Sequence, residues 1–145
     1  MATELASSRR QAGGRQATET MTTKRHQIRL SGDPHFQDCL RRARVRLCTE
    51  GVSDGRIADV ARHAVRLATP EEIISAHDGG CSPATQPPAK APDPTSMQLV
   101  GEAAVELNRM RGELIARGAE ALNLRAIVHC AICILAEKRE LAFPR

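Results

Sequence analysis

The chain has 145 residues, room for one domain or two very small ones, and a formal net charge of +4. It contains two Phe, no Trp and no Tyr, which argues against RNA-recognition and single-strand-binding modules that stack bases on aromatic side chains. No run of 18 apolar residues and no signal-peptide core are present, so we expect a cytoplasmic protein without a membrane span, whose five cysteines are reduced.

The positive charge is concentrated in the N-terminal third. Residues 1–48 carry ten Lys and Arg against four Asp and Glu, a net +6, which leaves about −2 for the rest. This layout is typical of a protein that faces a polyanion. Residues 1–23 have few large apolar side chains, and we expect them to form a disordered basic arm.

A short strand is predicted over residues 25–31, where apolar and polar side chains alternate. A strand of this length cannot form a core alone, so it must pair with a second strand. The inward face would hold His26, Ile28 and Leu30, and the outward face would hold Arg25, Gln27, Arg29 and Ser31.

Three helices are expected next. Asp33 and Pro34 are typical of an N-cap and first helical position, and an apolar stripe with helical spacing continues to about Glu50. Gly51 ends this helix, and we expect Ser53 to cap the next one. A short third helix is predicted from the Thr-Pro-Glu-Glu sequence at residues 69–72, and the first unit spans residues 24–78.

A second ordered block is predicted at residues 97–141, after a Pro-rich linker over residues 79–96. The pattern predicts a strand at Met97–Val100, then a helix, and a last helix capped by Asn123. The last helix is apolar on nearly all sides, so we expect it at the centre of the protein.

The two blocks share a strand–helix–helix layout. Ile28 and Leu30 match Met97 and Leu99 at an offset of 69 (97 − 28), as Phe36 matches Val105 and Val45 matches Leu114. The second helices match at an offset of 70, which places one extra residue in the loop between helices. The alternative is one such unit followed by an unrelated helical hairpin.

Residues 25–68 resemble a ribbon-helix-helix unit of the Arc/MetJ class, a mainly α fold in which two antiparallel strands enter the DNA major groove. Residues 24–141 are similar to tandem ribbon-helix-helix accessory proteins of T-DNA transfer, and residues 102–123 resemble MobC-type plasmid mobilisation proteins. This resemblance implies tandem units that form one pseudo-symmetric domain.

The resemblance also implies a set of DNA-contacting residues. Arg25, Gln27 and Arg29, with Ser31, would occupy the outward positions of the strand, and Gln98 would do so on a much less basic second strand. Backbone amides after Ser53, including Gly55, would clamp a phosphate, although the charge of Asp54 opposes this. Arg41 and Arg42 of the first helix would contact phosphates.

The implied function is sequence-specific binding of double-stranded DNA, as an accessory factor that helps a relaxase near a plasmid transfer origin. A repressor or antitoxin that uses the same ribbon is one alternative, and a helical protein-interaction module with a basic tail is another. The protein would be a monomer if it contains two ribbon strands, and a homodimer if it contains one.

No motif indicates an enzyme, a cofactor or a metal site. Cys130 and Cys133 form a CxxC sequence after His129, but they fall within an apolar helix and are interpreted as buried thiols. Cys39 falls on a core stripe. Cys48 and Cys81 have no assigned role, which leaves a four-cysteine metal site as an open alternative.

Overall fold

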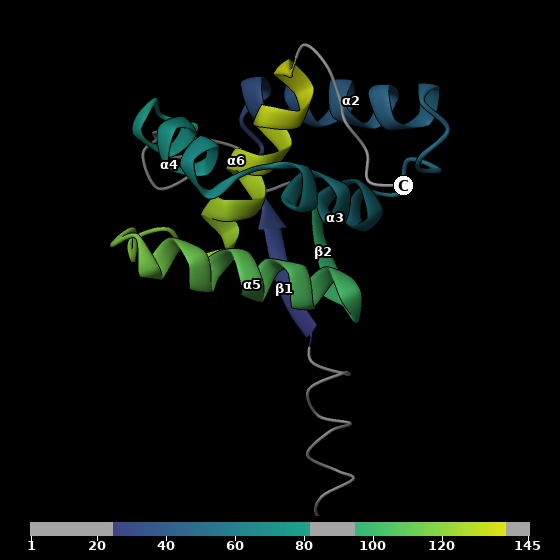
Figure 1. Ribbon diagram of the computed structural model, residues 1–145. Helices are drawn as coiled ribbons and strands as arrows, with labels where there is room; N and C mark the ends of the chain where they lie inside the picture. Colours follow the sequence, from purple (N-terminus) through teal and green to yellow (C-terminus); the bar gives the residue numbers. More distant parts are fainter. Residues whose placement is uncertain (1–24, 82–94, 139–145) are drawn as a thin grey trace, which may run out of the picture.

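The computed structural model describes residues 25–81 and 95–138, which form two strands and five helices (Figure 1). The expected arm, residues 1–23, lies outside the described residues, as does most of the expected linker. None of the described helices is long and apolar enough to cross a membrane. In chain order the elements are β1 (Arg25–Leu30), α2 (Pro34–Thr49), α3 (Ile57–Leu67), α4 (Pro70–Asp78), β2 (Thr95–Val100), α5 (Glu102–Ala116) and α6 (Leu124–Glu137).

The two strands pair with each other in an antiparallel ribbon. Ile28 lies opposite Met97, and Gln27 lies opposite Gln98. The expected strand at residues 97–100 is therefore present, although it begins at Thr95, inside the segment expected to be linker. The alternation works as predicted, because one face of the ribbon is buried through Ile28, Leu30, Met97 and Leu99.

Helix α6 is at the centre of the protein, as its apolar sequence predicted. Ten of its fourteen residues are buried, and it packs against α2, α3, α4, α5 and β1. Asn123 caps it as expected, since its Oδ1 accepts a hydrogen bond from the Ala126 amide at 2.8 Å. Figure 1 shows α6 running through the middle of the other helices.

The helices of the two strand–helix–helix segments are exchanged across the core. Helix α2 packs more extensively on α6 than on α3, and α5 packs more extensively on α3 than on α6. The strands follow the same rule, because β1 contacts α6 and β2 contacts α3. Neither segment therefore has a complete core without the other.

The structure corrects the register of the repeat. Phe36 is buried, whereas its expected match Val105 is 56% exposed, and Val45 is 58% exposed, whereas its expected match Leu114 is buried. The helices instead correspond at an offset of 67: α2 and α5 end at Thr49 and Ala116 (116 − 49), and α3 and α6 begin at Ile57 and Leu124 (124 − 57). The loops between helices therefore have equal length, and no extra residue is needed. The connection between strand and helix is instead shorter in the second segment.

The turn after the first helix is the same in both segments. Gly51 and Gly118, again 67 residues apart, both have positive φ values, +73° and +81°. A glycine adopts this backbone at little cost and ends the helix there. The amides of these glycines and of the residues after them donate to carbonyls at matching positions, Cys48 and Leu47 in the first turn and Ile115 and Leu114 in the second.

Leu47 and Leu114 occupy equivalent, fully buried positions at 0% exposure. We expect Leu47→Ala and Leu114→Ala each to lower the free energy of unfolding by about 2–5 kcal/mol, because each leaves a cavity in the shared core. Val45→Ala is the control on the exposed face of α2 and should change the free energy of unfolding by about 0.5 kcal/mol or less. Urea denaturation of the three variants measures this. An equal cost for Val45→Ala and Leu47→Ala would contradict the register.

Candidate nucleic-acid interface

The outward face of the ribbon presents the polar side chains of β1. Arg25, Gln27 and Arg29 are all exposed, as the alternation predicted. Two of them donate hydrogen bonds to side chains of the second strand: Arg25 Nη1 to Gln98 Oε1 at 3.4 Å, and Gln27 Nε2 to Ser96 Oγ at 3.4 Å. These long hydrogen bonds orient the side chains at the surface of the ribbon.

The charge of this face is one-sided. The outward residues of β2 are Ser96, Gln98 and Val100, and all three are exposed. Arg25 and Arg29 both lie on β1, so the two strands of the ribbon offer different chemistry at equivalent places. Such a surface is suited to an asymmetric ligand rather than to one with two identical halves.

Ser31 does not belong to this face, which corrects the prediction. It follows the end of β1 and is only 8% exposed. Its hydroxyl accepts a hydrogen bond from the Asp33 amide at 3.1 Å, and its carbonyl accepts one from Gln37 Nε2 at 2.7 Å. The chain turns here toward α2, so the alternation of the strand does not extend to residue 31.

His129 of α6 fixes this end of β1 from the inside. The buried imidazole accepts a hydrogen bond from the Ser31 amide at Nε2, at 3.0 Å. Its proton must therefore be on Nδ1, which lies 2.8 Å from the Arg125 carbonyl and donates to it. The ring also packs against Phe36 of α2, with 4.2 Å between ring centroids. The outward face is thus held on a rigid, packed support.

The loop before α3 is not arranged as expected. Helix α3 begins at Ile57, and its N-cap residue, Arg56, makes no side-chain capping bond, so Ser53 is not the cap. Ser53 Oγ instead accepts from the Gly55 amide at 3.0 Å, and Asp54 Oδ1 accepts from the Arg56 amide at 3.1 Å. Two of the amides that were expected to clamp a phosphate are therefore already occupied.

Gly55 and Asp54 also have structural reasons to occupy this loop. Gly55 is buried with φ +91°, and a Cβ there would lie 3.1 Å from Cys48 Sγ. Hydrogen bonds from the Arg56 backbone amide, and then from its side chain, lower the pKa of Asp54. This carboxylate remains charged and opposes a phosphate. Ser53 and Gly55 are therefore best explained by loop geometry.

Arg42 lies far from the ribbon, and its contact with a phosphate stays a prediction. Its Nη2 is 3.8 Å from Glu137 Oε2, at the C-terminal end of α6, whereas β1 contacts the N-terminal end of α6. The helix between residues 125 and 137 spans roughly 18 Å. Arg41 shares the Asp38 carboxylate with Arg42 and is well exposed; its contact with phosphate stays a prediction.

Arg125 is a basic residue of this surface that the sequence pattern did not identify. It lies in the first turn of α6, and its Nε donates to the Arg29 carbonyl at 2.7 Å. The contact joins residues 96 positions apart, so only the packing of α6 against β1 brings them together. One feature of the sequence could have identified it: Arg125 is a charged residue in the first turn of a helix that is otherwise mostly apolar and predicted to be central.

Comparisons of the chain with protein-family models, with curated proteins and with solved structures found no match.

Proposed function

We propose that this chain is a sequence-specific double-stranded DNA-binding protein with a tandem ribbon-helix-helix fold. The observation that carries the proposal is the antiparallel ribbon of β1 and β2, with Arg25, Gln27 and Arg29 exposed on its outer face. The exchanged packing of the four main helices is the arrangement expected when two such units share one core. Here a single chain supplies both.

A two-stranded ribbon has the width to enter the major groove, where each base pair presents its own pattern of donors and acceptors. An arginine can donate to both O6 and N7 of guanine, and a glutamine can pair with N6 and N7 of adenine. Arg25, Gln27 and Arg29 therefore serve as base-reading residues. Arg125 lies beside Arg29, where its positive charge can attract the phosphates of the DNA backbone next to the bases that are read.

The resemblance to accessory proteins of T-DNA transfer and to MobC-type proteins supports a role in plasmid transfer. In that role the protein binds near a transfer origin and assists a relaxase, and it has no catalytic activity of its own. Repression of a promoter by the same ribbon is the alternative, which differs in the DNA site and not in the chemistry of binding.

The base-reading role predicts that Gln27→Ala and Arg29→Ala each lose ~1–3 kcal/mol of discrimination, about 5- to 150-fold in affinity for the preferred site. A duplex selected from a random pool, titrated by fluorescence anisotropy at fixed salt, measures this. Arg117→Ala is the matched control, because Arg117 lies at the far end of α5 and pairs with Glu71.

Unchanged binding by Gln27→Ala and Arg29→Ala would refute the ribbon as the reader. Removal of residues 1–23 distinguishes a protein that reads DNA with its ribbon from one that binds DNA only through a basic tail. If a basic tail alone binds DNA, this deletion abolishes binding to every sequence equally. If the ribbon reads DNA, the deleted protein keeps its preference for the selected site.

The one-sided charge predicts a non-palindromic DNA site. We expect Gln98→Ala to weaken binding to the selected duplex less than Arg29→Ala, because β2 carries no arginine on its outward face. Sequencing of the selected pool gives the site directly. A consensus with two equivalent inverted halves would show that both strands read bases alike.

The single-chain ribbon predicts a monomer. Light scattering of the full chain should give the mass of one copy, 15.7 kDa, because both strands come from the same molecule and leave no ribbon strand to be completed by a partner. Twice that mass, unchanged on dilution, would point to a homodimer instead.

A further inference from the structure

Three potential metal ligands gather between α2 and α6. They are His35 and Cys39, one turn apart on α2, and Cys133 on α6, and their ligand atoms all lie within 4.8 Å of one another. His35 Nε2 is 3.7 Å from Cys39 Sγ. In tetrahedral zinc sites, Zn–S bonds of ~2.3 Å and Zn–N bonds of ~2.0–2.1 Å place neighbouring ligand atoms about 3.6–3.8 Å apart. The cluster needs only small side-chain movements to reach that geometry.

A fourth ligand stands next to this cluster. Cys81, which follows α4, lines a surface hollow together with Cys133. Cys133 belongs in turn to the cluster with Cys39 and His35. The four side chains come from the end of α4, from α6 and from α2. Cys130, the other half of the CxxC sequence, is not part of the three-residue cluster.

The surroundings suit metal-bound thiolates. Cys39 and Cys133 are buried, while His35 is exposed and provides a path from solvent. A bound cation would favour the thiolates, whose protons pass to solvent. Arg42 Nη2, 3.5 Å from Cys39 Sγ, adds a positive charge beside the sulfur.

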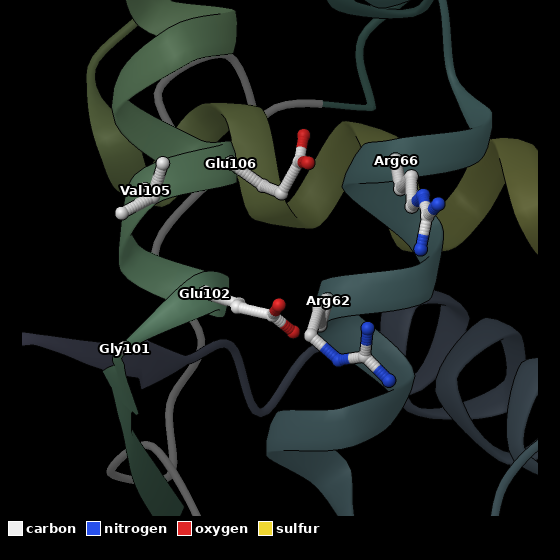
Figure 2. A pocket seen from close by; sticks show the side chains of 6 residues that line it. All are labelled: Arg62, Arg66, Gly101, Glu102, Val105 and Glu106. Atoms are coloured by element: carbon white, nitrogen blue, oxygen red, sulfur yellow. The ribbon is translucent and has the colours of Figure 1, made fainter.

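The equivalent place in the other half of the molecule holds no such group of potential metal ligands among the described residues, but acidic and basic side chains instead. There, a hollow of about 490 Å³ lies between α3 and α5. Figure 2 shows Glu102 and Glu106 of α5 across from Arg62 and Arg66 of α3. Opposite charges on the two sides of a solvent-exposed hollow between helices are ordinary. At the offset of 67, Glu102 corresponds to His35, Glu106 to Cys39, and Arg66 to Cys133.

We propose that His35, Cys39 and Cys133, with Cys81 as the fourth ligand, bind a zinc-class metal ion. The site has the donor set of a structural Cys₃His centre. Its ligands come from both strand–helix–helix segments and from the chain after α4. The metal therefore cross-links parts of the chain that are far apart in the sequence. It stabilises the exchanged arrangement of the helices and does not take part in reading DNA.

The test uses the full chain, purified under reducing conditions and freed of metal, and titrated with Co²⁺ alone and then with Zn²⁺. One equivalent of Co²⁺ should produce sulfur-to-metal charge-transfer absorption, which Zn²⁺ should abolish by displacement. Zn²⁺ should also raise the melting temperature. His35→Ala, Cys39→Ser and Cys133→Ser should each weaken Co²⁺ binding at least about tenfold, by analogy with the losses caused by outer-shell mutations.

Two cysteine variants are matched controls. Cys48→Ser removes an exposed thiol from α2, and Cys130→Ala removes a buried thiol from α6; both should bind Co²⁺ as the unmodified chain does. His35 is exposed, so His35→Ala should fold normally and keeps the test decisive if a buried variant does not fold. Cys81→Ser should lower affinity and shift the charge-transfer band, and an unchanged spectrum would remove Cys81 from the ligand set.

Three results would overturn the proposal. One is a full chain that takes up neither metal at micromolar concentration. Another is Co²⁺ binding that survives both His35→Ala and Cys133→Ser. The third is a Cys39–Cys133 disulfide, detected by mass spectrometry as the loss of two hydrogens, in protein isolated with thiols protected from air.

Discussion

The antiparallel pairing of β1 with β2 is the constraint on which the rest of the molecule depends. A two-stranded ribbon is marginally stable alone and needs helices against its buried face. Because the strands belong to different segments, pairing them brings α6 under β1 and α3 under β2. The first helices, α2 and α5, then bury their apolar stripes mainly on the second helix of the opposite segment. One pairing thus decides the whole exchanged core.

A shared backbone plan carries different side chains in its two halves. The turns at Gly51 and Gly118 and the lengths of the loops between helices agree, which reflects the geometric demands of a common core. The ribbon faces do not agree, because the arginines lie on β1. Likewise the contact of α2 with α6 holds His35, Cys39 and Cys133, where the contact of α3 with α5 holds acids and arginines. The demands of packing keep the backbone plan the same, whereas the side chains at the ribbon face and at these helix contacts differ between the two halves.

Local signals predicted the elements well because they depend on neighbouring residues only. Asp33 caps α2 and Thr69 forms a capping box with Glu72, as expected. Ser53 fails for a physical reason: its hydroxyl is used in the turn that accommodates Gly55, so α3 begins later. The predicted offset of the repeat was wrong for a different reason. Apolar residues of the two segments match at several offsets, and only the burial of Leu47 and the exposure of Val45 show which of the two faces the core.

The sequence by itself determined the alternating strand, the stripes of the helices, the central place of α6 and the outward position of Arg25, Gln27 and Arg29. These follow from periodicity, which acts over a few residues. Only the tertiary structure decided which side chains meet across the core. It buried Ser31, moved Arg42 to the far end of α6, brought Arg125 to Arg29 and gathered two cysteines from α2 and α6 beside His35. Such contacts depend on the strand register and on the exchange of helices, neither of which a single segment encodes.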